Sequence, residues 1–192
     1  MEIRKAQRHE LNILEKLARA IWPSTYSDII SAAQIEFMLS WMYAEQTLQS
    51  QFDEGHEFYI LSEQNSDLGF LALEWISSAT DRKQQTLKIN KLYILSQQQN
   101  KGFGKALIQK AIQRASETNV SEIILQVNKA NKAKDFYAHL GFQIKEEAIF
   151  DIGHGFVMDD YIMRRSLWGW KSEFDAKGRA FTRCTFLHKN SS

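Results

Sequence analysis

The stretch TLKINKLYILSQQQNKGFGKALIQKAI, residues 86–112, joins an apolar segment, a glycine-containing loop and a helical pattern. Gly102 and Gly104 directly precede apolar positions at helical spacing, such as Leu107 and Ala111. A helix N-terminus leaves its first N–H groups unpaired and carries partial positive charge, and glycine lets an anion approach the backbone. The arrangement therefore favours a phosphate-binding loop. An ordinary strand-to-helix turn is the alternative.

The spacing of this loop excludes two common phosphate-binding patterns. The Walker A pattern needs four residues between its glycines and a Lys-Ser/Thr pair at its end, and this loop has neither. The dinucleotide fingerprint needs a third glycine, where this chain has Leu107.

The apolar segment before the loop changes its alternation. Leu87 and Ile89 share one face of a regular strand, whereas the next apolar residues are Leu92 and Ile94. This slip of one residue near Asn90–Lys91 predicts a β-bulge. Bulges occur often next to active sites and release backbone N–H groups from the sheet. A strand that is simply apolar on both faces is the alternative.

Length, composition and charge indicate one globular domain. The chain has 192 residues, of which 44% are hydrophobic, and a net charge of +1, so no basic field for nucleic acid is indicated. No apolar run is long enough for a bilayer, and the first residues lack a secretory signal pattern. Cys184 is the only cysteine, which suits a reducing compartment. We expect a cytoplasmic protein without membrane or nucleic-acid partners, and the sequence leaves a homodimer open.

Helices and strands follow one another along the whole chain. Helical spacing predicts helices over Glu10–Trp22 (ended by Pro23), from Ser31 onward, and over Thr47–Asp53, Lys105–Thr118 and Asn131–Leu140. Alternating or apolar runs predict strands over Ile3–Ala6, 57–62, 69–76, 86–95, 122–127, 142–150 and 159–167. Because helices separate several strands, we expect a mixed sheet with helices on both faces.

Two motifs resemble those of the GNAT superfamily of acetyl-CoA-dependent N-acetyltransferases. Gln99–Gly104 has the form Q/R-x-x-G-x-G/A, and Asn131–Phe142 has the form N-x-A-x-x-F/Y-Y-x-x-x-G-F. The resemblance covers residues 1–167, which we expect to form the N-acetyltransferase domain, with 168–192 as a C-terminal extension of unknown role. It implies an α/β (α+β) fold whose mostly antiparallel sheet has about six to seven strands, with a bulged fourth strand and helices on both faces.

The resemblance also implies how acetyl-CoA is held as cosubstrate. Backbone amides around Leu92, Tyr93 and Ile94 would hold the pantetheine arm and polarise the thioester carbonyl. Asn131 would hydrogen-bond the cofactor, and Tyr137 would lie near its sulfur. The pyrophosphate cradle would comprise Gln99, Asn100, Lys101, Gly102, Phe103, Gly104 and Lys105.

Acetyl transfer to an amine needs a base and an acid. An alkyl amine with a pKa near 10.4 is protonated at neutral pH, so it must lose a proton before it attacks the thioester. The developing oxyanion needs donors such as bulge N–H groups, and the leaving thiolate needs a proton. Tyr137 has the chemistry of that acid, with a core aromatic on a helix stripe as the alternative.

The base is less clear from the sequence. Many relatives carry a glutamate on the fifth strand, but the matching residue here is Gln126, whose amide cannot accept the proton. Glu74 is the first substitute, with an outward-facing solvated residue as the alternative. Asp159 and Asp160 are further candidates, and water suffices for an exposed amine.

Residues 21–61 look similar to the equivalent segment of bacterial polyamine acetyltransferases. Four aromatic residues could form a wall for a cationic chain, and five acids could supply counter-charge; amphipathic helices with an aromatic core are the alternative. The aromatic residues are Trp22, Tyr26, Trp41 and Tyr43, and the acids are Asp28, Glu36, Glu45, Asp53 and Glu54.

The sequence leaves alternatives for the identity of the acceptor and for catalytic turnover itself. A small-molecule amine, polyamine-like, is favoured, while a protein or peptide amine remains an alternative. An acyl-CoA-binding regulatory module without turnover is the rival from another class. No histidine or cysteine spacing suggests a metal site.

Overall fold

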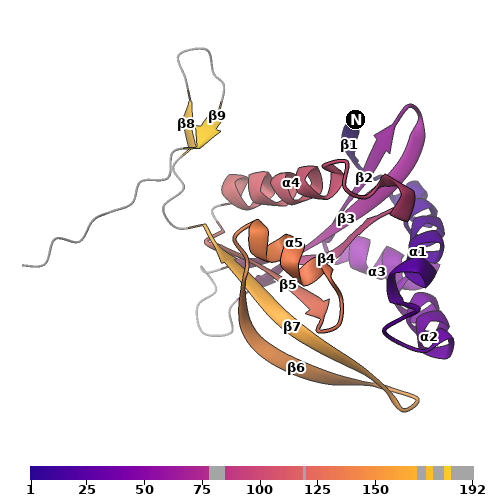
Figure 1. Ribbon diagram of the computed structural model, residues 1–192. Coiled ribbons are helices and arrows are strands. Elements are labelled where there is room, and N and C mark those ends of the chain that lie inside the picture. Colours follow the sequence, from indigo (N-terminus) through magenta and orange to yellow (C-terminus); the bar gives the residue numbers. More distant parts are fainter. Residues whose placement is uncertain (78–84, 119, 168–171, 175–179, 183–192) are drawn as a thin grey trace, which may run out of the picture.

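The computed structural model describes residues 1–77, 85–118, 120–167, 172–174 and 180–182. Its centre is a seven-stranded sheet in the order β1-β2-β3-β4-β5-β7-β6 (Figure 1). Every neighbouring pair is antiparallel except β4 and β5, which run parallel. The expected mixed, mostly antiparallel sheet is therefore confirmed.

Helices and strands alternate in the pattern expected from the sequence. The strands of the sheet are β1 (Glu2–Lys5), β2 (Glu57–Glu63), β3 (Ser66–Ser77), β4 (Gln85–Ile94), β5 (Glu122–Asn128), β6 (Gln143–Gly153) and β7 (Phe156–Ser166). The helices are α1 (Leu11–Tyr26), α2 (Ala32–Met42), α3 (Glu45–Asp53), α4 (Phe103–Glu117) and α5 (Ala133–His139), with short 3₁₀ turns η1 (Arg8–Glu10) and η2 (Ser96–Gln98). None of the described helices is long and apolar enough to cross a membrane.

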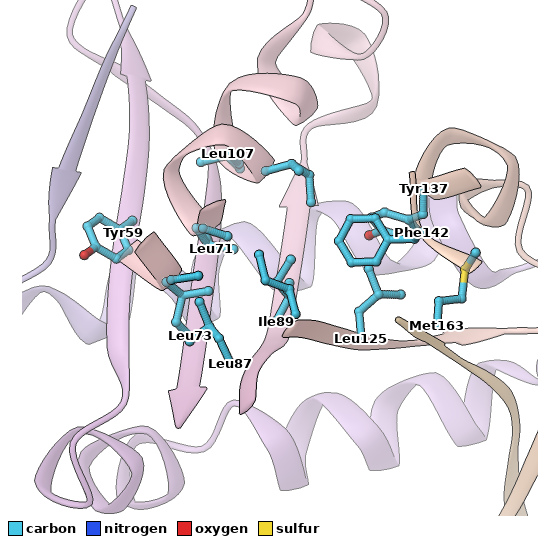
Figure 2. Close-up of a cluster of buried hydrophobic side chains, with 14 of the residues drawn as sticks. Tyr59, Leu71, Leu73, Leu87, Ile89, Leu107, Leu125, Tyr137, Phe142 and Met163 are labelled. Carbon is cyan, nitrogen blue, oxygen red and sulfur yellow. The ribbon is translucent and has the colours of Figure 1, made fainter. Parts of the chain in front are cut away.

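The sheet separates two hydrophobic clusters. One cluster packs α4 and α5 against the sheet and includes Leu87, Ile89, Leu107 and Tyr137 (Figure 2). The other packs α1, α2 and α3 against the opposite face, with Trp22 among its fully buried side chains. We call these two sides the α4–α5 face and the α1–α3 face.

The predicted bulge in β4 is confirmed. Ala72 pairs with Lys91 and Leu73 pairs with Ile89, so Asn90 is the extra residue. The bulge keeps the apolar side chains on one face, because Leu87 and Ile89 before it and Leu92 and Ile94 after it all contact the α4–α5 cluster. Lys91 is thereby turned to the α1–α3 face.

The last turn of α1 differs from the expectation. Pro23 was expected to end the helix, but α1 continues to Tyr26 and contains the proline. Proline fixes φ at a helical value, and its main cost is a lost hydrogen bond and a clash one turn back. The turn is supported because Ser24 and Thr25 both donate side-chain hydrogen bonds to the carbonyl of Ile21, at 2.9 and 3.0 Å.

The hairpin of β6 and β7 is longer than expected. The predicted strands 142–150 and 159–167 extend to Gly153 and begin at Phe156, so only His154 and Gly155 connect them. Both turn residues have positive φ. The hairpin extends from the rest of the sheet in Figure 1, and its tip contacts α2 through Phe37, whose ring lies 4.8 Å from His154 and 5.5 Å from Phe156.

The region expected as a C-terminal extension lies largely outside the described residues. Ser172–Phe174 (β8) and Ala180–Thr182 (β9) form a separate antiparallel pair. Cys184 also lies outside the described residues.

Candidate active site

A cleft of about 1330 Å³ opens where β4 and β5 separate. The parallel pairing of these strands covers only Leu87–Ile89 and Ile123–Leu125. Beyond it, the edge of β4 that faces β5 lines the cleft instead of a sheet partner. The cleft is lined by the first turns of α4 and α5, by residues of α1, α2 and α3, and by the β6–β7 hairpin.

The first turn of α4 offers backbone donors to this cleft. The first hydrogen bond of the helix runs from the N–H of Ala106 to the carbonyl of Gly102, at 3.0 Å. The N–H groups of Phe103, Gly104 and Lys105 precede it and have no helical acceptor. Gly102 has φ +86, and a Cβ there would meet nothing within 4 Å. Open space, unpaired donors and the helix dipole together fit a bound phosphate.

Gly104 lines the cleft and also has a role in helix packing. A Cβ at this position would lie 3.1 Å from Cζ of Phe136, on α5. The missing side chain therefore allows α4 and α5 to approach each other, and the two helices frame the cleft together. Of these two glycines, only Gly102 has open space where a Cβ would be.

Most of the predicted cofactor residues meet in the cleft. Two of the predicted set do not line it: Lys101 is exposed and donates to Gln98 Oε1 at 2.9 Å, and Phe103 is buried in the α4–α5 cluster. Phe103 keeps its backbone N–H at the start of α4. Those that line the cleft are Leu92, Tyr93, Ile94, Gln99, Asn100, Gly102, Gly104, Lys105, Asn131 and Tyr137.

Asn131 and Tyr137 enter the cleft from the β5–α5 region. Asn131 Oδ1 accepts the N–H of Ala133 at 2.9 Å, so its carbonyl side caps the turn and its amide group remains as a donor. Tyr137 is 8% exposed, and within the described part of the chain its hydroxyl has no hydrogen-bond partner. Burial raises the pKa of Tyr137, with a smaller contribution from Tyr26. The phenol is therefore protonated at neutral pH and can donate.

Glu74 lies on the α1–α3 face but outside the lining of the cleft. Its Oε2 accepts the Nδ2–H of Asn90 at 2.8 Å and lies 3.7 Å from Nζ of Lys88. These contacts hold the extra residue of the bulge, so the carboxylate is engaged in supporting β4.

Lys91 is a buried cation that lines the cleft, and it was not among the site residues predicted from the sequence. Its side chain is 2% exposed and lines the cleft, and its Nζ donates to Gln51 Oε1 at 3.0 Å and to Asn90 Oδ1 at 3.1 Å. Burial, followed by the charge of Lys88, lowers the pKa of Lys91 to about 8. The lysine joins α3 to the bulge. The slip in alternation at this residue was the signal for its unusual position.

Asp159 and Asp160 are adjacent in β7 but point to opposite faces. Asp159 forms an ion pair with Lys129, 2.6 Å away. Asp160 lines the cleft from the α1–α3 face and is 4% exposed. Burial raises the pKa of Asp160 to about 6; Asp159 adds to the shift and Lys129 opposes it. Strand alternation around the buried Met163 could have assigned the two faces from the sequence.

The expected aromatic wall is only partly present. Trp22 lines the cleft but is 1% exposed, and Tyr43 is fully buried beneath it in an edge-on contact. Tyr26 and Trp41 line the cleft with more of their surface accessible, and the Tyr26 hydroxyl lies 3.1 Å from that of Tyr93. Trp22 is on the inner stripe of α1, and Tyr43, which directly follows α2, is buried in the same cluster.

The expected counter-charges are mostly directed elsewhere. Only Asp28 of the five acids lines the cleft. Glu36 is paired with Arg19, and Asp53 is paired with Arg8. Glu45 and Glu54 accept hydrogen bonds from Gln49 and Ser50 on the surface of α3 and its end.

Comparison with known proteins agrees with this arrangement. A family model described as an acetyltransferase (GNAT) domain matches residues 26–158. A spermidine N(1)-acetyltransferase of Thermoplasma acidophilum is 26% identical over 165 residues, which is 83% of this chain and 96% of that protein. An uncharacterized N-acetyltransferase of Methanocaldococcus jannaschii is 33% identical over 92 residues, 46% of this chain and 40% of that protein.

Solved structures share the fold as well. The crystal structure of the PaiA N-acetyltransferase of Thermoplasma acidophilum in complex with coenzyme A has a TM-score of 0.71 and 24% identity, covering 86% of this chain and 98% of that one. Because the family model matches more than half of the residues, the chain belongs to the GNAT family of acetyltransferases.

Proposed function

We propose that this protein transfers the acetyl group of acetyl-CoA to a primary amine of a small molecule, with a polyamine as the favoured acceptor. The single observation that carries this proposal is the cleft at the separated β4 and β5. It combines backbone donors at the start of α4, a phenol that no described residue engages in a hydrogen bond, and a buried carboxylate.

The chain supplies a binding surface for each part of acetyl-CoA. The pyrophosphate would lie on the N–H groups at the start of α4, beside the side chain of Lys105. The pantetheine arm would take the place of a strand partner along Leu92–Ile94, and the Asn131 amide would donate to it. Bound acetyl-CoA supplies an activated thioester, whose carbonyl needs donors such as these backbone groups.

Tyr137 is the proposed acid of the reaction. It is protonated at neutral pH, largely buried in the lining of the cleft and unengaged by hydrogen bonds in the described part of the chain. A phenol in this state can deliver a proton to the leaving thiolate. Glu74 is better assigned to support of the bulge, because Asn90 and Lys88 hold its carboxylate outside the cleft.

The acceptor end of the cleft favours a cation with an aliphatic chain. Asp28 and Asp160 supply negative charge, and Trp41, 50% exposed, supplies an aromatic surface. The similarity to a spermidine acetyltransferase supports the same class of acceptor. A peptide amine remains the alternative within the same chemistry.

Two measurements on the purified protein test this function. Calorimetric titration should show binding of acetyl-CoA, with ATP as the control that should not bind. Mass spectrometry should then detect acetylated product with spermidine, a short monoamine and a peptide with a single α-amino group as separate acceptors. We expect turnover to be fastest with spermidine.

The outcomes separate the competing functions. Faster turnover of the peptide than of spermidine would show that the acceptor is a peptide amine and not a polyamine. Acetyl-CoA binding without turnover of any amine would favour a regulatory acyl-CoA-binding module. Absence of acetyl-CoA binding would contradict the transferase function as a whole.

A further inference from the structure

Asp160 is a buried carboxylate that no described residue pairs with. Its side chain is 4% exposed, and within the described residues no hydrogen bond or ion pair involves its oxygens. Burying an unpaired carboxylate costs desolvation free energy, so the pKa of such a group rises unless a ligand with positive charge binds beside it. A positively charged ligand that enters the cleft would therefore stabilise the Asp160 carboxylate.

The position of Asp160 agrees with such a partner. Asp160 pairs with Asn128 of β5 and with Ala148 of β6, neither of which is charged. It lies on the α1–α3 face of β7, as does Met158, which contacts the α1–α3 cluster. The cleft joins this place to Tyr137 and to the free edge of β4.

We propose that the Asp160 carboxylate binds the ammonium group of the acceptor and acts as the general base that removes its proton. This inference rests on the proposed function and names the base that the sequence did not identify. Asp160 would be a catalytic residue, because it touches the reacting nitrogen.

The proton balance of the transfer is complete with Asp160 and Tyr137. The ammonium gives one proton to Asp160, and the nitrogen lone pair forms a bond to the thioester carbonyl carbon. The carbon–sulfur bond breaks, and the thiolate takes the phenolic proton of Tyr137. The nitrogen loses its second proton, which restores the phenol, and Asp160 releases its proton to solvent.

The charges around Asp160 suit a base at neutral pH. Asp159 on the same strand raises its pKa and Lys129 after β5 lowers it, while burial is the largest influence. Tyr26 of α1 also faces this carboxylate, since the charge of Asp160 contributes to the raised pKa of that phenol after the larger effect of burial. With a pKa of about 6, Asp160 is ionised at pH 7 and is a stronger base than an ordinary aspartate.

The matched pair Asp160→Asn and Asp159→Asn tests the proposal. Each substitution removes one carboxylate charge from adjacent residues of one strand. Asp160→Asn should lower kcat/KM for spermidine at pH 7 by about 100-fold, within the usual range for a general base. Asp159→Asn should stay within about threefold of the wild type, because it removes a partly exposed ion pair and an influence on the pKa of Asp160 that is smaller than burial. Both variants should bind acetyl-CoA as the wild type does.

The pH profile distinguishes a base from a structural residue. The wild-type rate should rise through a pKa near 6 and then level off. Asp160→Asn should lack this step, and its rate should rise between pH 7 and 10, where the amine itself loses its proton. Asp160→Glu, which keeps a carboxylate, should retain the step at a reduced rate and serves as the second variant if Asp160→Asn is unstable.

A measurement without turnover provides an independent readout. Because the folded-state pKa of Asp160 lies above the ordinary 3.8, the carboxylate destabilises the fold increasingly as pH rises from about 4 to 6. Asp160→Asn should therefore melt several degrees higher than the wild type at pH 7 and at nearly the same temperature at pH 4.

The possible results separate this inference from the proposed function. Wild-type activity and an unchanged pH profile in Asp160→Asn would overturn the role of Asp160 alone. An equal loss in Asp159→Asn would do the same, because it would reveal a general charge effect. Absence of product with the wild-type protein would overturn both proposals.

Discussion

The two faces of the sheet contribute to one cleft by different physical means. On the α4–α5 face, the site includes backbone N–H groups at the start of α4, next to the open space at Gly102. On the α1–α3 face it consists of isolated side chains, such as Asp160 and Lys91, that are buried with few or no charged partners. The first kind of site needs a local conformation, whereas the second needs the whole fold.

The largest effect, a loss of acetyl-CoA affinity, is expected from Gly102→Val. This substitution tests the part of the cleft formed by backbone N–H groups at the start of α4. Valine at φ +86 is strained by about 1–2 kcal/mol, and its side chain would enter the open space that we propose for the phosphate. We expect acetyl-CoA affinity to fall by roughly 100-fold or more, as the direct contacts to a charged group are lost. Isothermal titration calorimetry measures this change.

Gly55→Val is the matched control for that substitution. Gly55 has φ +91, its Cβ position is equally open, and it lies outside the lining of the cleft. Both variants should lose similar thermal stability, but only Gly102→Val should lose acetyl-CoA affinity. Equal losses of affinity would show that backbone strain alone, and not the cradle, explains the effect.

Tyr137→Phe tests the proposed acid, which lies on the α4–α5 face. It should lower kcat by about 100-fold, because the thiolate then leaves without a proton donor. Acetyl-CoA affinity should change little. Tyr161→Phe is the control, since Tyr161 is a partly buried tyrosine outside the cleft lining. Unchanged kcat in Tyr137→Phe would assign this ring to packing alone.

Lys91→Met tests the α1–α3 face by its effect on the thermal stability of the protein. The pKa of Lys91 is lowered to about 8, so the folded state releases this proton more readily than the unfolded state. The charged Lys91 ammonium therefore lowers the free energy of unfolding of the wild type below pH 8, and this penalty disappears as pH rises towards 10.5. Lys91→Met should melt a few degrees above the wild type at pH 7, with a difference that shrinks by pH 10.

Differential scanning calorimetry over this pH range gives the answer for Lys91. Lys88→Met is the comparison, because Lys88 is a partly exposed neighbour of the same strand. A constant difference between wild type and Lys91→Met from pH 7 to 10 would contradict the burial of a titrating ammonium.

Trp41→Ala should have the smallest effect and sharpens the assignment of the acceptor. An exposed cation–π contact contributes about 0.5–1 kcal/mol, which corresponds to a roughly two- to fivefold rise in KM for spermidine. A short monoamine, which has no second ammonium group to place on Trp41 while the first one reacts, should show no change. Equal changes for both amines would remove Trp41 from acceptor binding.

The difference between the faces also explains what the sequence could predict. Gly102 and Asn131 lie in contiguous motifs whose spacing reflects local backbone geometry, so their region was recognised, and the slip at Asn90–Lys91 correctly predicted the bulge. Asp160 could only be a candidate among several acids, because its burial depends on α1, β5 and β6 meeting around it.

The mistaken expectations have the same origin. Tyr43 follows the aromatic pattern of a binding wall, yet packing places it in the core. Pro23 carries a strong local signal for a helix end, but hydrogen bonds and packing in the last turn of α1 outweigh it. Local rules failed where tertiary contacts supplied more free energy than the local preference.

The most direct test of the account is transfer of the acetyl group itself. The protein would be incubated with spermidine and with acetyl-CoA that carries an isotopic label in the acetyl group, and both products would be quantified by mass spectrometry. We predict labelled N-acetylspermidine and CoA in equal amounts, formed only when protein and both substrates are present. Binding of acetyl-CoA with no labelled amine product, or release of CoA at a rate independent of spermidine, would contradict the account.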